Sequence, residues 1–238
     1  REEPRGGEDV HLTIDTRLQH LLEVALDRRM VECEAPRAMG MLMDPHTGAI
    51  LALANRPAFD PNLYTEADPA LRNNAAVTGY VEPGSSFKIV TAAAALELGV
   101  ITPETMIDCE GGVMYIKRRR IKDSHRSEGQ IPFAECFAES SNIAMIKVAA
   151  LLGQERLDEW IRRFGFGVRT SRDFLVESPG MLRPRSKWTS YSMGSLPMGQ
   201  EIGTTMPQLA RAFAAVATGG RLVEPHYINR AVARDGTV

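Results

Sequence analysis

A serine and a lysine three residues apart are the first residues of this sequence whose types and spacing suggest chemistry. Ser85 and Lys88 follow the pair Pro83-Gly84, which breaks the preceding loop and places Ser85 at the start of a helix. The separation of three residues puts both side chains on one helical face. A serine hydroxyl is a weak nucleophile until a base lies beside it, and a lysine amine serves as that base when burial keeps it neutral. The spacing predicts Ser85 as a nucleophile and Lys88 as its general base.

The helix that follows supports this interpretation. Residues 85–98 are apolar on every side and end at Gly99, so the helix is predicted to be buried and Lys88 to face a dry core. The amides at its start, next to Gly84, are suited to stabilise an oxyanion, and we place Gly84 among the candidate substrate-binding residues. The alternative is a serine that only caps the helix and a lysine that reaches the surface, because S-x-x-K is a loose motif.

A second polar group interrupts an apolar segment. Ser140, Ser141 and Asn142 lie within "FAESSNIAMIKVAALL", where the pattern predicts one helix over residues 133–152. Buried hydroxyl and amide groups need partners, so a cleft beside Ser85 is the functional interpretation. There Ser140 would relay a proton, Asn142 would hold a substrate amide or the lysine, and Ser141 would contact substrate. The alternative is a polar patch that faces solvent.

The remaining elements follow from periodicity and turn residues. A short strand at residues 12–14 precedes a helix capped by Asp15 or Thr16, and residues 39–43 and 49–54 form a hairpin. Residues 56–83 are predicted to be an irregular loop. A second hairpin carries the basic run at residues 117–120, which we interpret as a solvated face, with glycan or partner binding as the alternative. Further helices are expected at residues 154–163 and 206–218, and a strand-like segment follows.

Composition excludes several classes. The 238 residues are 44% hydrophobic and 24% charged, which is typical of a folded protein, and the net charge of -2 gives no sign of nucleic-acid binding. Three cysteines without a C-x-x-C pair indicate neither a disulfide framework nor a zinc site, and we expect no disulfide. The five histidines lack ligand spacing. Neither residue type therefore indicates a metal site.

The ends of the sequence suggest a piece of a longer protein. The opening residues are polar, with no initiator Met, signal peptide or membrane span, so we interpret residues 1–9 as a linker remnant and residues 10–238 as one domain.

At this point the chain resembles the transpeptidase domain of class B penicillin-binding proteins of the cell-division type. The resemblance runs from about residue 10 to the end. The matching segments occur in the family's order: "HLTIDTRLQ", "DPHTGAILALANRPAFDPN", "EPGSSFK", "ESSN", "RFGFG" and "MGQEIGTTMPQLARAFAAVATGG". The S-x-x-K and S-x-N motifs together are typical of this set of enzymes.

The resemblance implies a fold and a function. The fold would be of the α/β class, α+β type: the penicillin-binding and serine β-lactamase-like transpeptidase fold, with helices around an antiparallel sheet. Ser85 would attack the D-Ala-D-Ala carbonyl of a peptidoglycan stem peptide, with Lys88 as base and with Ser140 and Asn142 in the second motif. β-Lactams would acylate Ser85, and no metal or cofactor would take part. The resemblance also implies an extracytoplasmic domain, anchored in the parent protein by an N-terminal transmembrane helix and associated with division proteins.

One departure from the family concerns its third motif, Lys-Thr-Gly or Lys-Ser-Gly. The five lysines are followed by Ile89, Arg118, Asp123, Val148 and Trp188. We therefore expect a truncation before that motif, a sheet short of its C-terminal strands, and little or no transpeptidase activity from these residues alone. Two alternatives share the same motifs, namely a serine β-lactamase or β-lactam sensor, and a non-catalytic penicillin-binding scaffold of the division complex.

Overall fold

The computed structural model describes residues 7–125 and 129–233, and the chain divides into two compact units. The first unit comprises Arg1–Gly79, Arg169–Ser178 and Thr205–Val238, and the second comprises Tyr80–Val168 and Pro179–Thr204. Each unit is thus assembled from segments that are far apart in the sequence.

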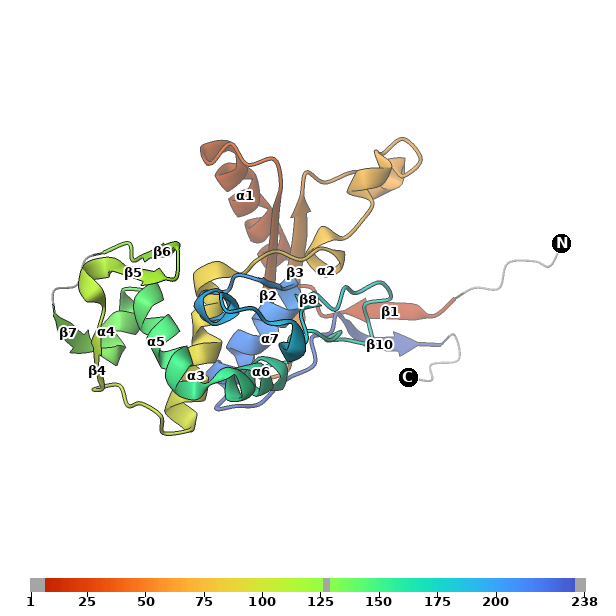
Figure 1. The fold of residues 1–238 in the computed structure, drawn as a ribbon. Helices are drawn as coiled ribbons and strands as arrows, with labels where there is room; N and C mark the ends of the chain where they lie inside the picture. The colour runs from red at the N-terminus through yellow and green to blue at the C-terminus, as the bar shows by residue number, and fades with distance from the viewer. Residues whose placement is uncertain (1–6, 126–128, 234–238) are drawn as a thin grey trace. The chain divides into compact units, whose positions relative to one another are not determined.

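The first unit brings the two ends of the described chain together. Strand β1 (Asp9–Leu12) pairs antiparallel with β10 (Ile228–Val232), and the two arrows lie side by side in Figure 1. Helix α1 (Thr16–Glu32) begins at the predicted cap, where the Asp15 side chain accepts hydrogen bonds from two backbone amides. Of the predicted linker, residues 1–6 lie outside the described residues, and Asp9 already belongs to β1.

The predicted hairpin is present in the first unit. Strands β2 (Ala38–Met43) and β3 (Ile50–Arg56) pair antiparallel, and α1 packs against both. Ile50, Val77 and Phe174 form a buried cluster beside this hairpin, and Met41 and Met43 pack against it. The hairpin therefore supplies one wall of the core of this unit.

Short helices occupy the segment predicted as an irregular loop. They are η1 (Pro61–Leu63), η2 (Pro69–Leu71) and α2 (Ala75–Thr78), the first two 3₁₀ turns capped by aspartate side chains. Helix α7 (Met206–Ala217) packs against α2 and β2. It opens with a capping box in which the Thr205 and Gln208 side chains satisfy each other's backbone amides.

Helices dominate the second unit. A 3₁₀ turn, η3 (Gly84–Phe87), continues directly into α3 (Lys88–Glu97), which packs against α5 (Asn142–Leu152) and α6 (Gln154–Arg163). The alanines of α3 allow this close approach. Phe87 and Phe166 meet edge to face with ring centroids 5.1 Å apart, which fixes the start of α3 in the core.

The strands of the second unit form three short antiparallel pairs among the described residues. These pairs are β4 (Met106–Asp108) with β7 (Gln130–Pro132), β5 (Val113–Ile116) with β6 (Arg119–Lys122), and β8 (Met181–Leu182) with β9 (Ile202–Gly203). The 3₁₀ turns η4 (Glu110–Gly112), η5 (Arg185–Lys187), η6 (Ser192–Gly194) and η7 (Leu196–Met198) lie between them. Ile121, Ile143, Ile146 and Met198 join the β5–β6 hairpin to α5 and η7 in one buried cluster.

The single helix predicted over residues 133–152 is wrong. Helix α4 (Phe133–Ala138) ends before Glu139, and α5 begins at Asn142. Ser140 has φ 57°, a left-handed conformation that no α-helix contains. The next residue, Ser141, restarts the helix because its hydroxyl accepts a hydrogen bond from the Ala144 amide at 3.0 Å. The three polar residues thus form a turn between two helices.

Two of the three cysteines lie together in the core of the second unit. Cys109 and Cys136 are buried free thiols with sulfur atoms 3.7 Å apart, and Cys33 is an exposed free thiol in the first unit. No cluster of three or more potential metal ligands occurs within the described ranges. In the part of the chain that the structure describes, no helix has both the length and the apolar character needed to cross a membrane.

Candidate active site

Ser85 lies on an exposed turn at the start of α3. Gly84 adopts φ 56° just before it, and the Gly84 amide donates to the Gly199 carbonyl at 3.1 Å. The neighbouring Ser86 hydroxyl donates to the Pro83 carbonyl at 2.7 Å, which closes the turn. The Ser85 side chain is exposed, and among the described residues its hydroxyl has no hydrogen-bond partner. Ser85 is therefore presented to solvent by a turn whose backbone is held from both sides.

Lys88 is buried one turn later, with 3% of its surface exposed. Its Nζ donates to the carbonyl oxygen of Ser140 at 2.5 Å and lies 3.0 Å from the Ser140 hydroxyl. A neutral amine has two N–H donors and one lone pair. When both donors point at Ser140, the lone pair remains free to accept a proton. The described contacts contain no hydrogen bond between Ser85 and Lys88, so a proton transfer between them needs a small approach or a bridging water.

The environment of Lys88 makes the neutral amine more accessible than it is for a lysine in water. Burial lowers the pKa of Lys88 from 10.5 to about 8, and the nearby carboxylate of Asp123 acts in the opposite direction. A group with a pKa of about 8 is neutral in roughly one molecule in ten at pH 7. A small but usable fraction of Lys88 is therefore present as the neutral amine at pH 7, and this is the form that can accept a proton.

The predicted second motif divides into three different positions. Ser140 contacts the lysine, as described above. Asn142 lines the pocket beside Ser85, but its Nδ2 donates to the Lys122 carbonyl at 2.7 Å and not to a group on Lys88. Ser141 is 2% exposed and points inward, where its hydroxyl donates to Asp123 Oδ2 at 2.6 Å. The structure thus brings Ser140 and Asn142 to the site and leaves the Ser141 hydroxyl in the core beneath it.

A pocket of about 320 Å³ opens beside Ser85. Gly84, Asn142, Met198 and Gln200 line it together with residues 119–122 of strand β6. The basic run had been predicted as a solvated face, and Arg119 shows that this is wrong for one of its members. Its guanidinium is half-buried and donates to the Ser195 hydroxyl at 2.5 Å and to Gln200 Oε1 at 2.6 Å. The described residues that line the pocket therefore include three cationic side chains and no carboxylate.

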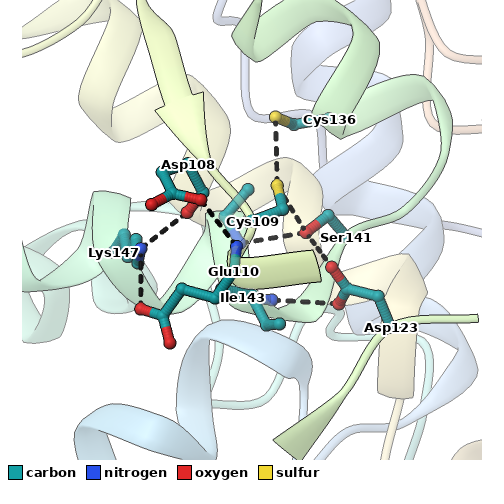
Figure 2. A network of polar contacts seen from close by, with 9 residues as sticks. Asp108, Cys109, Glu110, Asp123, Cys136, Ser141, Ile143 and Lys147 are labelled. Atoms are coloured by element: carbon teal, nitrogen blue, oxygen red, sulfur yellow. Dashed lines mark hydrogen bonds and ion pairs between the residues drawn. The ribbon is translucent and has the colours of Figure 1, made fainter. Parts of the chain in front are cut away.

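Two groups of site residues were missed by sequence reasoning. Asp123 follows β6 directly and accepts hydrogen bonds from the start of α5 (Figure 2). The segment from Ser195 to Thr204 supports the turn of Ser85 from another direction, because Thr204 and Val81 exchange two backbone hydrogen bonds. These residues lie far from Ser85 in the sequence. The hairpin before Asp123 was predicted, and residues 198–204 belong to one of the segments that resemble the family, but neither pattern indicated a place at the site.

Comparisons with known proteins agree with this geometry. The family model described as penicillin binding protein transpeptidase domain matches residues 38–237. The chain therefore belongs to the family of penicillin-binding protein transpeptidase domains, and the family predicted from the motifs is confirmed.

Individual relatives give the same picture. Penicillin-binding protein PbpB of Mycolicibacterium smegmatis is 34% identical over 242 residues, with 100% of this chain and 37% of that protein covered. Stage V sporulation protein D of Bacillus subtilis is 32% identical, with 94% of this chain and 35% of that protein covered. The chain thus spans between a third and two fifths of the length of these curated relatives.

A solved structure confirms the fold. Penicillin binding protein 3 of Mycobacterium tuberculosis, complexed with aztreonam, superposes with a TM-score of 0.89 at 29% identity. The match covers 100% of this chain and 53% of that chain. The predicted fold class, helices with antiparallel strands in a penicillin-binding transpeptidase fold, is therefore confirmed.

Proposed function

We propose that this chain is the catalytic part of a peptidoglycan D,D-transpeptidase and that Ser85 is its nucleophile. One observation carries the assignment: an exposed serine stands one helical turn before a buried lysine whose amine is held by Ser140. Relatives named as probable peptidoglycan D,D-transpeptidases support the substrate class, for which we propose a stem peptide that ends in D-Ala-D-Ala. The protein acts outside the cytoplasm, where that substrate lies, in association with other division proteins and with its parent chain anchored in the membrane.

The reaction proceeds in two acyl transfers. Lys88 Nζ accepts the Ser85 proton while Oγ forms a bond to the carbonyl carbon of the penultimate D-Ala. The carbon–nitrogen bond then breaks, and the proton passes, with Ser140 as relay, to the departing terminal D-Ala. An amine of a neighbouring stem peptide attacks the Ser85 ester, loses a proton to the lysine and releases the serine. The Gly84 amide already donates to Gly199, so the following amide, that of Ser85, is the one that stabilises the oxyanion of each step.

β-Lactams enter the same first step. Their ring amide opens when Ser85 attacks the carbonyl carbon, and the leaving nitrogen stays attached to the acyl group. Solved relatives complexed with aztreonam and ampicillin support this part of the proposal. Gly84 and Asn142 line the pocket and contact the bound acyl chain, whereas substrate contact by Ser141 would require its inward-facing hydroxyl to move.

The test is covalent labelling with a fluorescent penicillin, followed by mass spectrometry of the labelled peptide. We expect an adduct on Ser85 that Ser85→Ala abolishes and the matched variant Ser86→Ala retains. No K-[ST]-G sequence occurs among the five lysines, so we expect residues 1–238 alone to label slowly. A companion fragment that carries such a strand should accelerate labelling.

Three results would change these assignments. An adduct on another residue, or none after long incubation with and without the companion fragment, would exclude Ser85 as nucleophile. Rapid stoichiometric labelling of residues 1–238 alone would contradict the low activity expected of them. Fast turnover of a chromogenic cephalosporin would instead indicate a β-lactamase, because that activity requires rapid hydrolysis of the Ser85 ester.

A further inference from the structure

A single carboxylate holds the turn that contacts the lysine. Asp123 follows β6 and accepts three hydrogen bonds from the consecutive residues 141–143. Figure 2 shows those from Ser141 and Ile143. Oδ1 accepts from the Asn142 amide at 2.6 Å and from the Ile143 amide at 3.1 Å. Oδ2 accepts from the Ser141 hydroxyl at 2.6 Å. Both oxygens of Asp123 are thus occupied by the residues that directly follow Ser140.

These contacts act where a helix needs them. The first amides of α5 have no partner within the helix, and a negative charge is favourable at a helix N-terminus. The residue before Asp123 adds a fourth link, because the Lys122 carbonyl accepts from Asn142 Nδ2 at 2.7 Å. With Ser141, Asn142 and Ile143 fixed to the end of β6, Ser140 keeps its left-handed backbone and its carbonyl stays on Lys88.

Asp123 also acts on the charge of the lysine. It raises the pKa of Lys88 against the larger, opposite effect of burial. The charged side chains on the helices packed against α3 are Lys147 on α5 and Glu155, Arg156, Asp158, Glu159, Arg162 and Arg163 on α6. None of them contributes to the Lys88 shift, and Lys147 is paired with Glu110 at 2.8 Å. Among the described residues, Asp123 is thus the charged group that affects the pKa of Lys88.

We propose that Asp123 is the positioning residue of this site: its carboxylate fixes the Ser140 turn on Lys88 through its hydrogen bonds to residues 141–143. The proposal rests on the function assigned to Ser85 and Lys88. It gives the carboxylate two separable effects, one on geometry through three hydrogen bonds and one on protonation through its charge.

The first test measures Lys88 without any acylation. With ¹³Cε-labelled lysine, the chain gives five lysine signals, and the variant Lys88→Met assigns the one of interest. We expect the Lys88 titration midpoint in Asp123→Asn to fall by roughly half a unit or more, because the raising charge is gone. The matched control is Glu139→Gln, which removes the same charge from an exposed side chain adjacent to Ser140 and should leave the midpoint unchanged.

The second test separates geometry from charge. Ser141→Ala removes the hydrogen bond to Asp123, together with the cap on the Ala144 amide, but keeps the carboxylate, so we expect an unchanged Lys88 midpoint and a several-fold slower maximal rate of Ser85 labelling. Asp123→Asn should lower the maximal rate of Ser85 labelling, and it should also lower the pH at which labelling reaches half of that rate. The Ser141 variant also tests the proposal if Asp123→Asn fails to fold, since its normal labelling rate would then contradict it.

The outcomes distinguish this inference from the proposed function. Unlabelled Ser85 in the wild-type chain, with the Lys88 midpoint still lowered in Asp123→Asn, would refute the function and retain the coupling. An unchanged midpoint in a folded Asp123→Asn variant, or an equal shift in Glu139→Gln, would overturn the role of Asp123 while leaving the Ser85 assignment intact.

Discussion

The Nζ atom of Lys88 lies 2.5 Å from the backbone carbonyl oxygen of Ser140. A contact to the main chain cannot be removed by changing a side chain, so the position of the amine follows the backbone conformation of Ser140. That conformation is left-handed, with φ 57°, and lies at the break between α4 and α5. The chemistry assigned to Lys88 therefore depends on a helix break that brings one carbonyl toward α3.

The lowered pKa of Lys88 predicts how stability depends on pH. Between a folded pKa of about 8 and an ordinary value of 10.5, the folded amine is neutral while the unfolded amine binds a proton. Unfolding then takes up a proton, so the free energy of unfolding rises with pH across this window, by roughly 3 kcal/mol in total. Below pH 8 both states are protonated and the slope vanishes.

Urea unfolding of the wild type and of Lys88→Met at intervals from pH 7 to 11 measures this effect. The difference between the two free energies of unfolding isolates Lys88, because the other groups titrate alike in both proteins. A difference that stays constant above pH 8 would show that Lys88 is not a buried amine with a lowered pKa.

The left-handed backbone of Ser140 predicts an order of stability for two substitutions. Ser140→Gly and Ser140→Ala both remove the hydroxyl beside Lys88, but only alanine retains a Cβ that opposes φ 57°. We expect the glycine variant to be more stable than the alanine variant by about 1 kcal/mol, measured by chemical denaturation. Both should slow acylation of Ser85 by a similar factor. Equal stability, or a more stable alanine variant, would exclude the left-handed turn.

Gly199 predicts a steric limit next to the nucleophile turn. A Cβ at this position would lie 2.2 Å from the Gly84 carbonyl oxygen and 2.8 Å from the Cβ atom of Phe87. Gly199→Ala should cost about 3 kcal/mol or more and should displace the turn of Ser85. Gly99→Ala is the matched control, because Gly99 also has a positive φ but no atom within 4 Å.

Thermal unfolding of Gly199→Ala and Gly99→Ala separates two costs of the added Cβ. One is the backbone strain at positive φ, and the other is the steric clash with residue 84. The control should lose about 1 kcal/mol from its backbone conformation alone. If both variants lose the same free energy, the close approach of residues 84 and 199 does not limit the site.

The half-buried guanidinium of Arg119 predicts a link between the hairpin and the nucleophile. Arg119→Gln removes hydrogen bonds to Ser195 and Gln200, on either side of the glycine that contacts the Ser85 turn. We expect a loss of about 1–2 kcal/mol of stability and a several-fold slower labelling of Ser85. Arg118→Gln changes an exposed residue of the same hairpin without a described partner, and should alter neither quantity. Equal effects of both variants would indicate a general loss of positive charge.

Local features of this fold were predictable from the sequence. Three examples are the Asp15 cap, the β2–β3 hairpin and the position of Ser85 one turn before a buried Lys88. Each depends on residues within a few positions of one another. In such segments, the residue types themselves indicate helix caps, the alternation of apolar and polar residues in strands, and helical spacing. Ser85 and Lys88 could be proposed as nucleophile and base for the same reason.

Other parts of the site had no local signal. The break between α4 and α5 at Ser140 was missed because apolar residues continue on both sides. A serine residue also gives no indication in the sequence that its φ is positive. Asp123 was missed because its three hydrogen bonds reach residues 18 to 20 positions away. The interleaving of two units is likewise a property of the folded chain, since each unit takes residues from separate stretches. Tertiary contacts decide all three features.

The support of the Ser85 turn by the segment up to Thr204 has a consequence for the timing of folding. The amide of Glu201 donates to the Glu82 carboxylate across 119 residues, and the hydroxyl of Thr204 reaches the Val81 carbonyl across 123. Closing loops of this length is slow compared with forming a helix. During synthesis, α3 therefore forms long before its neighbouring turn is held in place. The turn that carries Ser85 is fully held only after residue 204 has left the ribosome.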